Sequence, residues 1–173
     1  ANAGDPTLED GRPAAALYGE RMSEELARLF PQATPPLQIA ARGQHVERWL
    51  LARASYPEGR EGYLAWRRAQ GRRHAERVAG IMRNAGLAAP QIEAAERMLR
   101  KEGIKRDAEV QALEDTICFV FLRWYFKPFA EGRDLEGLLK IVSQTARKMS
   151  PEGRARALAE FDLPEPFAAF FRG

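Results

Sequence analysis

The sequence has 173 residues, of which 45% are hydrophobic and 29% are charged, a composition typical of one globular domain with a real core. Its 27 lysines and arginines against 24 acidic residues give a net charge of +3, which is weak evidence for a nucleic-acid partner. No apolar run is long enough to cross a bilayer, and the single cysteine, Cys118, excludes an internal disulfide and a cysteine-rich zinc site. We therefore expect a cytoplasmic protein without a membrane segment.

The first residue is not Met, and no basic and then apolar leader follows it, so we expect a trimmed start and no secretion. Helix signals recur along the chain, and no alternating run predicts a strand. Thr34, Asp107, Asp134 and Ser150 are predicted helix caps. The predicted helices cover residues 14–30, 34–51, 61–85, 90–101, 108–126 and 135–149, with a last one from 151.

The predicted helix 108–126 is apolar almost all round between Thr116 and Phe126, which is typical of a helix in the middle of a bundle. The sequence thus predicts an all-α single domain over residues 1–173, built around this central buried helix. Residues 1–12 form an N-terminal segment, and residues 162–173 form a phenylalanine-rich tail. That tail packs on its own domain or on a second subunit, so both a monomer and a homodimer stay open.

One face of the predicted helix 61–85 carries Tyr63, Arg67, Gln70 and His74, at offsets of four, seven and eleven residues. This face continues into apolar residues, as in a helix that lines a pocket at one end and packs in the core at the other. The alternative is a helix that leaves the domain into solvent.

Two further polar positions are candidates for chemistry. Asp115 has core-like neighbours on its helix face, and an inward carboxylate needs an ion-pair partner or a metal. His45 lies at a helix edge, near Arg48 and Trp49. A neutral imidazole and a carboxylate are compatible with a metal, so the sequence predicts a pocket with His45, Asp115 and His74.

The rim of that pocket is predicted to be basic. Guanidinium groups suit phosphate or carboxylate ligands, and aromatic side chains can stack on a ring. Trp49, Tyr63 and Trp66 serve equally well as ordinary core or rim aromatics. The predicted ligand-binding residues are Arg42, Gln44, Arg48, Trp49, Arg53, Tyr63 and Arg67.

Five segments together resemble the bacterial family called domain of unknown function 4202. The segments read LYGERMSEEL, AARGQHVERW, YLAWRR with HAERVAGIM, RDAEVQALEDTICFVFL and RKMSPEG, and the resemblance spans nearly the whole chain. The family label implies no established activity.

A more distant resemblance is to the HD superfamily of helical metal-dependent phosphohydrolases, which implies an HD-like fold. Carried over by position, Tyr18 stands where that family has its first histidine, and His45-Val46 where it has a His-Asp pair. His74 and Asp115 match a later histidine and the final aspartate. The resemblance therefore implies an altered metal site held by His45 and Asp115, with Tyr18 lining the pocket. It would take one divalent ion of Fe, Mn, Zn, Ni or Co.

Three function classes stay open. The first is an HD-like hydrolase of a phosphorylated or other anionic small molecule, with an unusual metal site or none. A metal-bound hydroxide, held by His45 and Asp115, would be the nucleophile, and His74 would be the proton donor. The second is a non-catalytic module that binds an anionic metabolite on the same scaffold. The third, an RNA-binding helical domain, is disfavoured by the modest net charge, so nucleic acid is not an expected partner. Whether the protein is an enzyme is left open.

Overall fold

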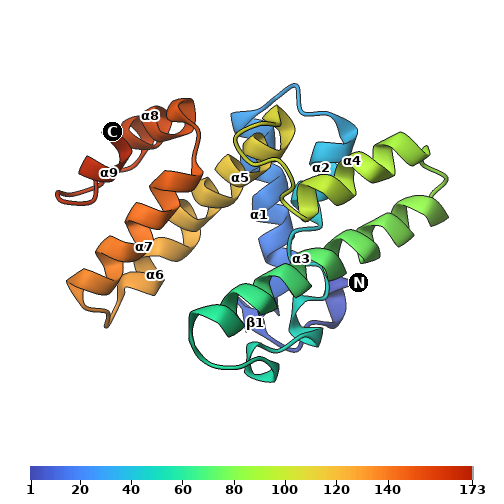
Figure 1. Ribbon diagram of the computed structural model, residues 1–173, viewed down its shortest axis with the longest axis horizontal. Coiled ribbons are helices and arrows are strands. Elements are labelled where there is room, and N and C mark those ends of the chain that lie inside the picture. The colour runs from blue at the N-terminus through green and yellow to red at the C-terminus, as the bar shows by residue number, and fades with distance from the viewer. Residues whose placement is uncertain (173) are drawn as a thin grey trace. The chain divides into compact units, whose positions relative to one another are not determined.

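The computed structural model describes residues 1–172 and confirms the predicted all-α fold (Figure 1). The residues group into two compact units, Ala1–Gly103 and a second that begins at Ile104. The single domain predicted over residues 1–173 stays a prediction, and Gly173, at the end of the predicted tail, lies outside the described residues. No helix within residues 1–172 is long and apolar enough to cross a membrane.

The first unit contains four α-helices, preceded by a short ordered segment. In chain order its elements are η1 (Asn2–Gly4), β1 (Leu8–Glu9), β2 (Arg12–Pro13), α1 (Ala14–Leu29), α2 (Pro35–Arg42), η2 (Arg48–Leu50), η3 (Arg53–Ser55), α3 (Gly59–Asn84) and α4 (Ala89–Leu99). The two strands pair antiparallel, Leu8 with Pro13 and Glu9 with Arg12.

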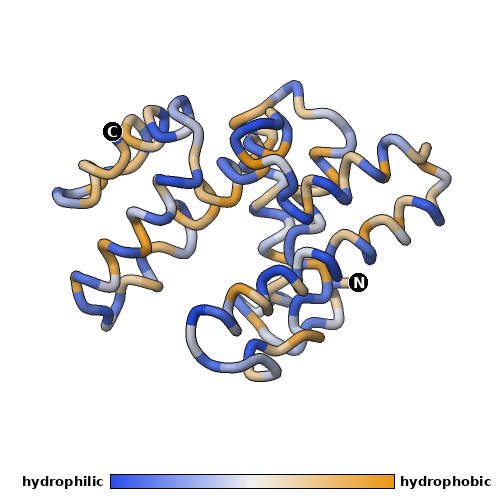
Figure 2. The backbone as a smooth tube through the Cα atoms, viewed as in Figure 1, coloured by the Kyte–Doolittle hydropathy of each residue, from blue (hydrophilic) through white to orange (hydrophobic). Residues whose placement is uncertain are grey.

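The helices of the first unit bury a core of aliphatic side chains. Met22 of α1, Met82 of α3 and Met98 of α4 are among its fully buried members. α3 packs on α4, and Gly71 allows a close approach, since a Cβ there would lie 3.3 Å from the Leu99 carbonyl oxygen. Hydrophilic and hydrophobic residues are interspersed along α3 (Figure 2), and its buried face includes the polar Gln70 and His74 beside apolar residues.

The predicted helix 34–51 is wrong beyond Arg42, where α2 ends. Thr34 caps its start as predicted, accepting a hydrogen bond from the Leu37 amide. The next residue, Gly43, lies close against α3, since a Cβ there would be only 2.5 Å from Cγ2 of Val78. The chain then turns, with Glu47 at a left-handed φ of 51°. Residues 44–51 therefore form a loop with a short η2, which we call the His45 loop.

The second unit consists of α5 (Ala108–Val120), the π-helical η4 (Phe121–Tyr125), α6 (Phe126–Ala130), α7 (Leu135–Lys148), α8 (Pro151–Glu160) and α9 (Ala169–Arg172). The predicted central helix 108–126 is present, but its helical path continues to Ala130 through the π-helical turn. Its α5 part is largely buried, whereas Arg123 in η4 is exposed. Asp107, Asp134 and Ser150 cap their helices through side-chain hydrogen bonds, which confirms those predictions.

Candidate functional site

Two histidines and a tyrosine from three segments of the first unit lie side by side. Tyr18 comes from α1, His45 from the His45 loop and His74 from α3. The Tyr18 and His45 rings stack at 3.6 Å with an interplanar angle of 13°, and the His45 and His74 ring centroids are 6.4 Å apart. Tyr18 and His74 are buried, whereas His45 is half-buried. The structure thus brings together three of the predicted site residues.

Arg48 places a half-buried positive charge beside these rings. Its guanidinium lies over the buried Trp66 ring, 4.7 Å from the ring centroid, a cation–π arrangement. Within residues 1–172, the guanidinium has no carboxylate at ion-pair distance and donates no hydrogen bond. Burial lowers the pKa of Arg48, although a guanidinium stays charged near neutral pH. The site therefore holds a partly desolvated charge that no described residue neutralises.

The amide of Gln70 fastens the His45 loop to α3. Its nitrogen Nε2 donates to the carbonyl oxygens of Arg48 at 2.9 Å and of Leu51 at 3.0 Å. The Trp66 indole also donates to the Leu51 carbonyl, at 3.0 Å. On the other side of the loop, the Glu47 amide donates to the Asn2 side chain at 2.8 Å. The backbone that carries His45 and Arg48 is thereby held from both sides.

Several buried polar atoms in this region have no hydrogen-bond partner within residues 1–172. They are Nε2 of His74, Oε1 of Gln70 and Nε2 of Gln44. Buried polar groups in proteins are nearly always hydrogen-bonded, and an unsatisfied one costs about 1–3 kcal/mol. Beside the unpaired charge of Arg48, these atoms leave hydrogen-bonding capacity that a bound ligand or a water would satisfy.

The electrostatic surroundings keep both histidines neutral near pH 7. Burial lowers the pKa of His74 to about 3, with Arg48 adding to the shift. Burial and the nearby Arg48 also hold the pKa of His45 well below 6.5, and Lys101 acts in the same direction. Each neutral ring offers one N–H donor and one acceptor. The proton-donor role expected of His74 stays a prediction.

We define the Arg48 cluster as Tyr18, His45, Arg48, Trp66, Gln70 and His74. Arg67 lies close enough to affect the pKa of Arg48, and its Nη1 donates to the Tyr63 hydroxyl at 3.3 Å. Both Arg67 and Tyr63 are exposed. They therefore lie beside the Arg48 cluster, on the surface.

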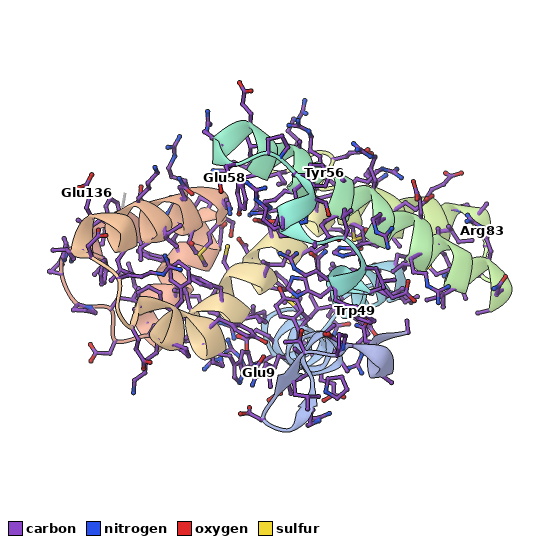
Figure 3. The ribbon with its side chains drawn as sticks, turned by 90° about the horizontal axis from the view of Figure 1, so that it is seen from below. Glu9, Trp49, Tyr56, Glu58, Arg83 and Glu136 are labelled. Carbon is purple, nitrogen blue, oxygen red and sulfur yellow. The ribbon has the colours of Figure 1, made fainter. Side chains whose placement is uncertain are left out.

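Other predicted ligand-binding residues have different neighbours. Arg53 donates to the carbonyl oxygens of Tyr56 and Pro57, each at 2.9 Å, and so holds the loop before α3. Figure 3 labels Trp49, Tyr56 and Glu58 along that segment, and Trp49 is half-buried. Arg42 makes a 3.6 Å ion pair with Glu20. It also lines a groove of about 340 Å³ between α1 and α2, with Ser23, Leu26, Ala27, Phe30, Pro31, Ala33, Gln38 and Ile39.

Asp115 belongs to the second unit, where its carboxylate holds the start of α8. Its Oδ1 accepts from the Ser150 amide at 2.8 Å and from Gln111 Nε2 at 2.9 Å, and its Oδ2 accepts from Ser150 Oγ at 2.6 Å. Burial raises the pKa of Asp115, while the hydrogen bonds from Ser150 and Gln111 oppose that shift. These donors, rather than an arginine, satisfy the inward carboxylate. Its joint site with His45 stays a prediction.

The Arg48 cluster does not fit a resident divalent metal. Within residues 1–172, no group of three or more His, Cys, Asp or Glu side chains is placed to hold a metal ion. The charges that lower the pKa of His45, from Arg48, Lys101 and Arg67, would also repel a cation. A divalent ion needs several ligands held together, usually with a carboxylate among them or nearby.

The prediction from sequence missed two contributors to this site. Lys101 follows α4 and acts on both histidines, but no local pattern connects it with residues 45 or 74. Trp66 is expected from the sequence as a stacking surface or as a core or rim aromatic, and its contact with Arg48 is not predicted: its ring lies under that guanidinium. Its spacing of four residues from Gln70, and of eight from His74, does predict a shared helix face.

The chain was compared with protein-family models, curated proteins and solved structures. No curated protein and no solved structure matches it. The model of one family, described as a domain of unknown function (DUF4202), matches residues 1–170. This match covers nearly the whole chain, as the resemblance of its five segments predicts. The protein therefore belongs to the DUF4202 family.

Proposed function

We propose that the first unit binds a small anionic ligand, of the class of phosphorylated metabolites, at the Arg48 cluster. The observation that carries this proposal is the half-buried Arg48 guanidinium, which has no carboxylate and no hydrogen-bond acceptor within residues 1–172. Removing a charge from water is costly unless a counter-charge compensates it. A bound oxyanion would supply that charge and accept the free N–H groups.

The surrounding groups support an anion in preference to a cation. A guanidinium offers a planar fork of donors that matches phosphate or carboxylate oxygens. The neutral His45 and His74 rings add N–H donors without adding charge. Trp66 under the guanidinium fixes its plane, and Gln70 fixes the loop backbone. The donors are thus held in place before the ligand arrives, which lowers the entropic cost of binding.

The metal-dependent phosphohydrolase implied by the HD superfamily stays a prediction. The residues of the Arg48 cluster do not fit a divalent ion, so we propose no reaction step through a metal. The proposal is a binding function on an HD-like helical scaffold, which is the second of the three classes expected from the sequence.

Titration calorimetry with sulfate and with inorganic phosphate tests this proposal. Sulfate keeps its charge between pH 5 and 8, so its binding reports on the protein alone. The Arg48→Met variant should weaken sulfate binding by about tenfold or more, because a charge-assisted pair contributes about 1.5–3 kcal/mol. The matched control is Arg83→Ala, which removes one exposed, unpaired arginine at the end of α3. Equal affinity for sulfate in both variants would contradict the proposal.

A further inference from the structure

The positive charge of the protein is concentrated on one helix. α3 carries seven arginines, no lysine and only two acidic residues, Glu61 and Glu76, a net charge of +5. The whole chain has a net charge of only +3, so the remaining residues together are slightly acidic. The whole-chain value therefore hides a strongly basic surface element.

The arginines of α3 are exposed and mostly lack acidic partners. Arg77 alone among them forms an ion pair, 3.0 Å from Glu47. The other six have no carboxylate within ion-pair distance in residues 1–172: Arg60, Arg67, Arg68, Arg72, Arg73 and Arg83. Elsewhere in the first unit, arginines such as Arg21 and Arg28 are paired with glutamates. Six exposed arginines without an acidic partner among residues 1–172 thus lie on α3.

The length and composition of α3 fit an extended polyanion. Its 26 residues span about 39 Å. Arg68 and Arg72 are one turn apart, about 6 Å, and Arg73 follows Arg72 about 100° further round the helix. Phosphates follow one another along a nucleic-acid strand at comparable intervals, and arginine suits bidentate phosphate contacts. We propose that α3 binds the sugar–phosphate backbone of a nucleic acid through its exposed arginines.

The buried side of α3 disfavours a membrane surface as the partner. A helix that lies in a membrane interface needs a free apolar face to insert. The apolar residues Trp66, Val78 and Met82 of α3 are buried in the protein. Its exposed apolar side chains are Tyr63 and Leu64 near one end and Ile81 near the other. Figure 3 labels Glu58, before the first of these ends, and Arg83 near the second.

Fluorescence anisotropy with labelled RNA and DNA strands of 15 nucleotides tests the proposal. The triple variant Arg68→Ala, Arg72→Ala, Arg73→Ala should bind about tenfold or more weakly at 50 mM salt. Its plot of log K against log salt should be shallower by about 2, because each lost phosphate contact removes about 0.7 from the slope. Comparing the affinities for RNA and for DNA shows which of the two the protein prefers. Removing the two negative charges of α3 with Glu61→Gln and Glu76→Gln should raise the affinity for the strand.

The matched control is the triple variant Lys127→Ala, Lys140→Ala, Arg147→Ala, which loses the same charge from exposed positions of the second unit. It should keep the wild-type salt slope and bind within about twofold of wild type. The proposal is overturned if both triple variants weaken binding equally, since net charge alone would then explain it. It is also overturned if wild type binds neither strand at 50 mM salt, or binds only vesicles of anionic lipid.

This proposal does not rest on the Arg48 cluster. Arg48 lies in the His45 loop and is half-buried, so Arg48→Met should leave the salt slope unchanged. Loss of sulfate binding in that variant, with normal RNA or DNA binding, separates the two sites. The α3 triple variant is expected to bind sulfate normally and to bind RNA or DNA more weakly.

Discussion

The second unit surrounds the buried Asp115 with hydrogen-bond donors, whereas the first unit leaves the half-buried Arg48 guanidinium without an acceptor among residues 1–172. Asp115 receives three hydrogen bonds, from Gln111 and Ser150. Arg48 has only an aromatic face below it, and Nε2 of the neighbouring His74 has no partner within residues 1–172. A satisfied buried charge is typical of structure, whereas an unsatisfied one indicates a place for a ligand. The following experiments test this difference between Asp115 and Arg48.

The largest effect is expected for Asp115→Ala. The change removes the acceptor of two hydrogen bonds from Ser150 and of one from Gln111, whose Nε2 keeps only its bond to the Lys148 carbonyl. It also removes the hold on α8, so the free energy of unfolding should fall by about 3 kcal/mol. Urea denaturation measures it. Asp162→Ala, at an exposed position of the same unit, should change stability by less than about 0.5 kcal/mol. An equal loss of unfolding free energy in both variants would contradict a structural role of Asp115.

A pH-dependent loss of stability is expected from the buried histidines. The folded pKa of His74, about 3, lies below its ordinary value near 6.5, so the unfolded chain binds the proton more tightly. Stability is therefore retained above pH 6.5 and lost as the pH falls toward 3. Between pH 6.5 and 5 the loss should be about 2 kcal/mol for this residue. Denaturation of wild type and of His74→Gln at both pH values measures this loss. The same change in unfolding free energy with pH in both proteins would contradict a buried neutral His74.

A smaller effect of opposite sign is expected for Arg48→Met without ligand. The variant removes an unpaired, partly desolvated charge and loses only a cation–π contact, so it should be about 1 kcal/mol more stable than wild type. Adding sulfate should raise the melting temperature of wild type and not that of the variant. A variant that is clearly less stable than wild type would place Arg48 among the structural residues.

The smallest expected effect concerns the pH dependence of sulfate binding. An anion beside His45 favours its protonated form and raises the low pKa of that ring. Binding is then coupled to proton uptake, so sulfate affinity should rise as the pH falls from 7.5 to 5.5. Calorimetry in buffers of different ionisation enthalpy detects the proton uptake directly. A sulfate affinity that does not change with pH would show that His45 does not interact with the bound anion.

The parts of the structure that depend on neighbouring residues were predictable from the sequence. The caps at Asp107, Asp134 and Ser150 were predicted because each bonds an amide within the next three residues. The end of α2 at Arg42 was missed, and the residue after it, Gly43, packs against Val78, 35 positions further along the chain, a contact that no local pattern shows. The π-helical turn at η4 likewise gave no local signal.

The candidate site divides in the same way. The pairing of His45 with His74 and Arg48 could be predicted in part, from helix faces and a distant family resemblance. The neutral state of His74 could not, because it results from burial by residues of several segments. The excess of arginines in α3 can be read from the sequence, but which of them lack an acidic partner cannot, because ion pairs depend on the fold.

The most direct test of the anion site is a crystal structure of the protein grown with selenate, an analogue of sulfate, with data collected at the selenium edge. We expect an anomalous peak within hydrogen-bond distance of the Arg48 guanidinium and of a nitrogen of His45 or His74. We also expect that the peak is absent in Arg48→Met. Selenate bound only at the exposed arginines of α3, with none at Arg48, would contradict the proposed anion site.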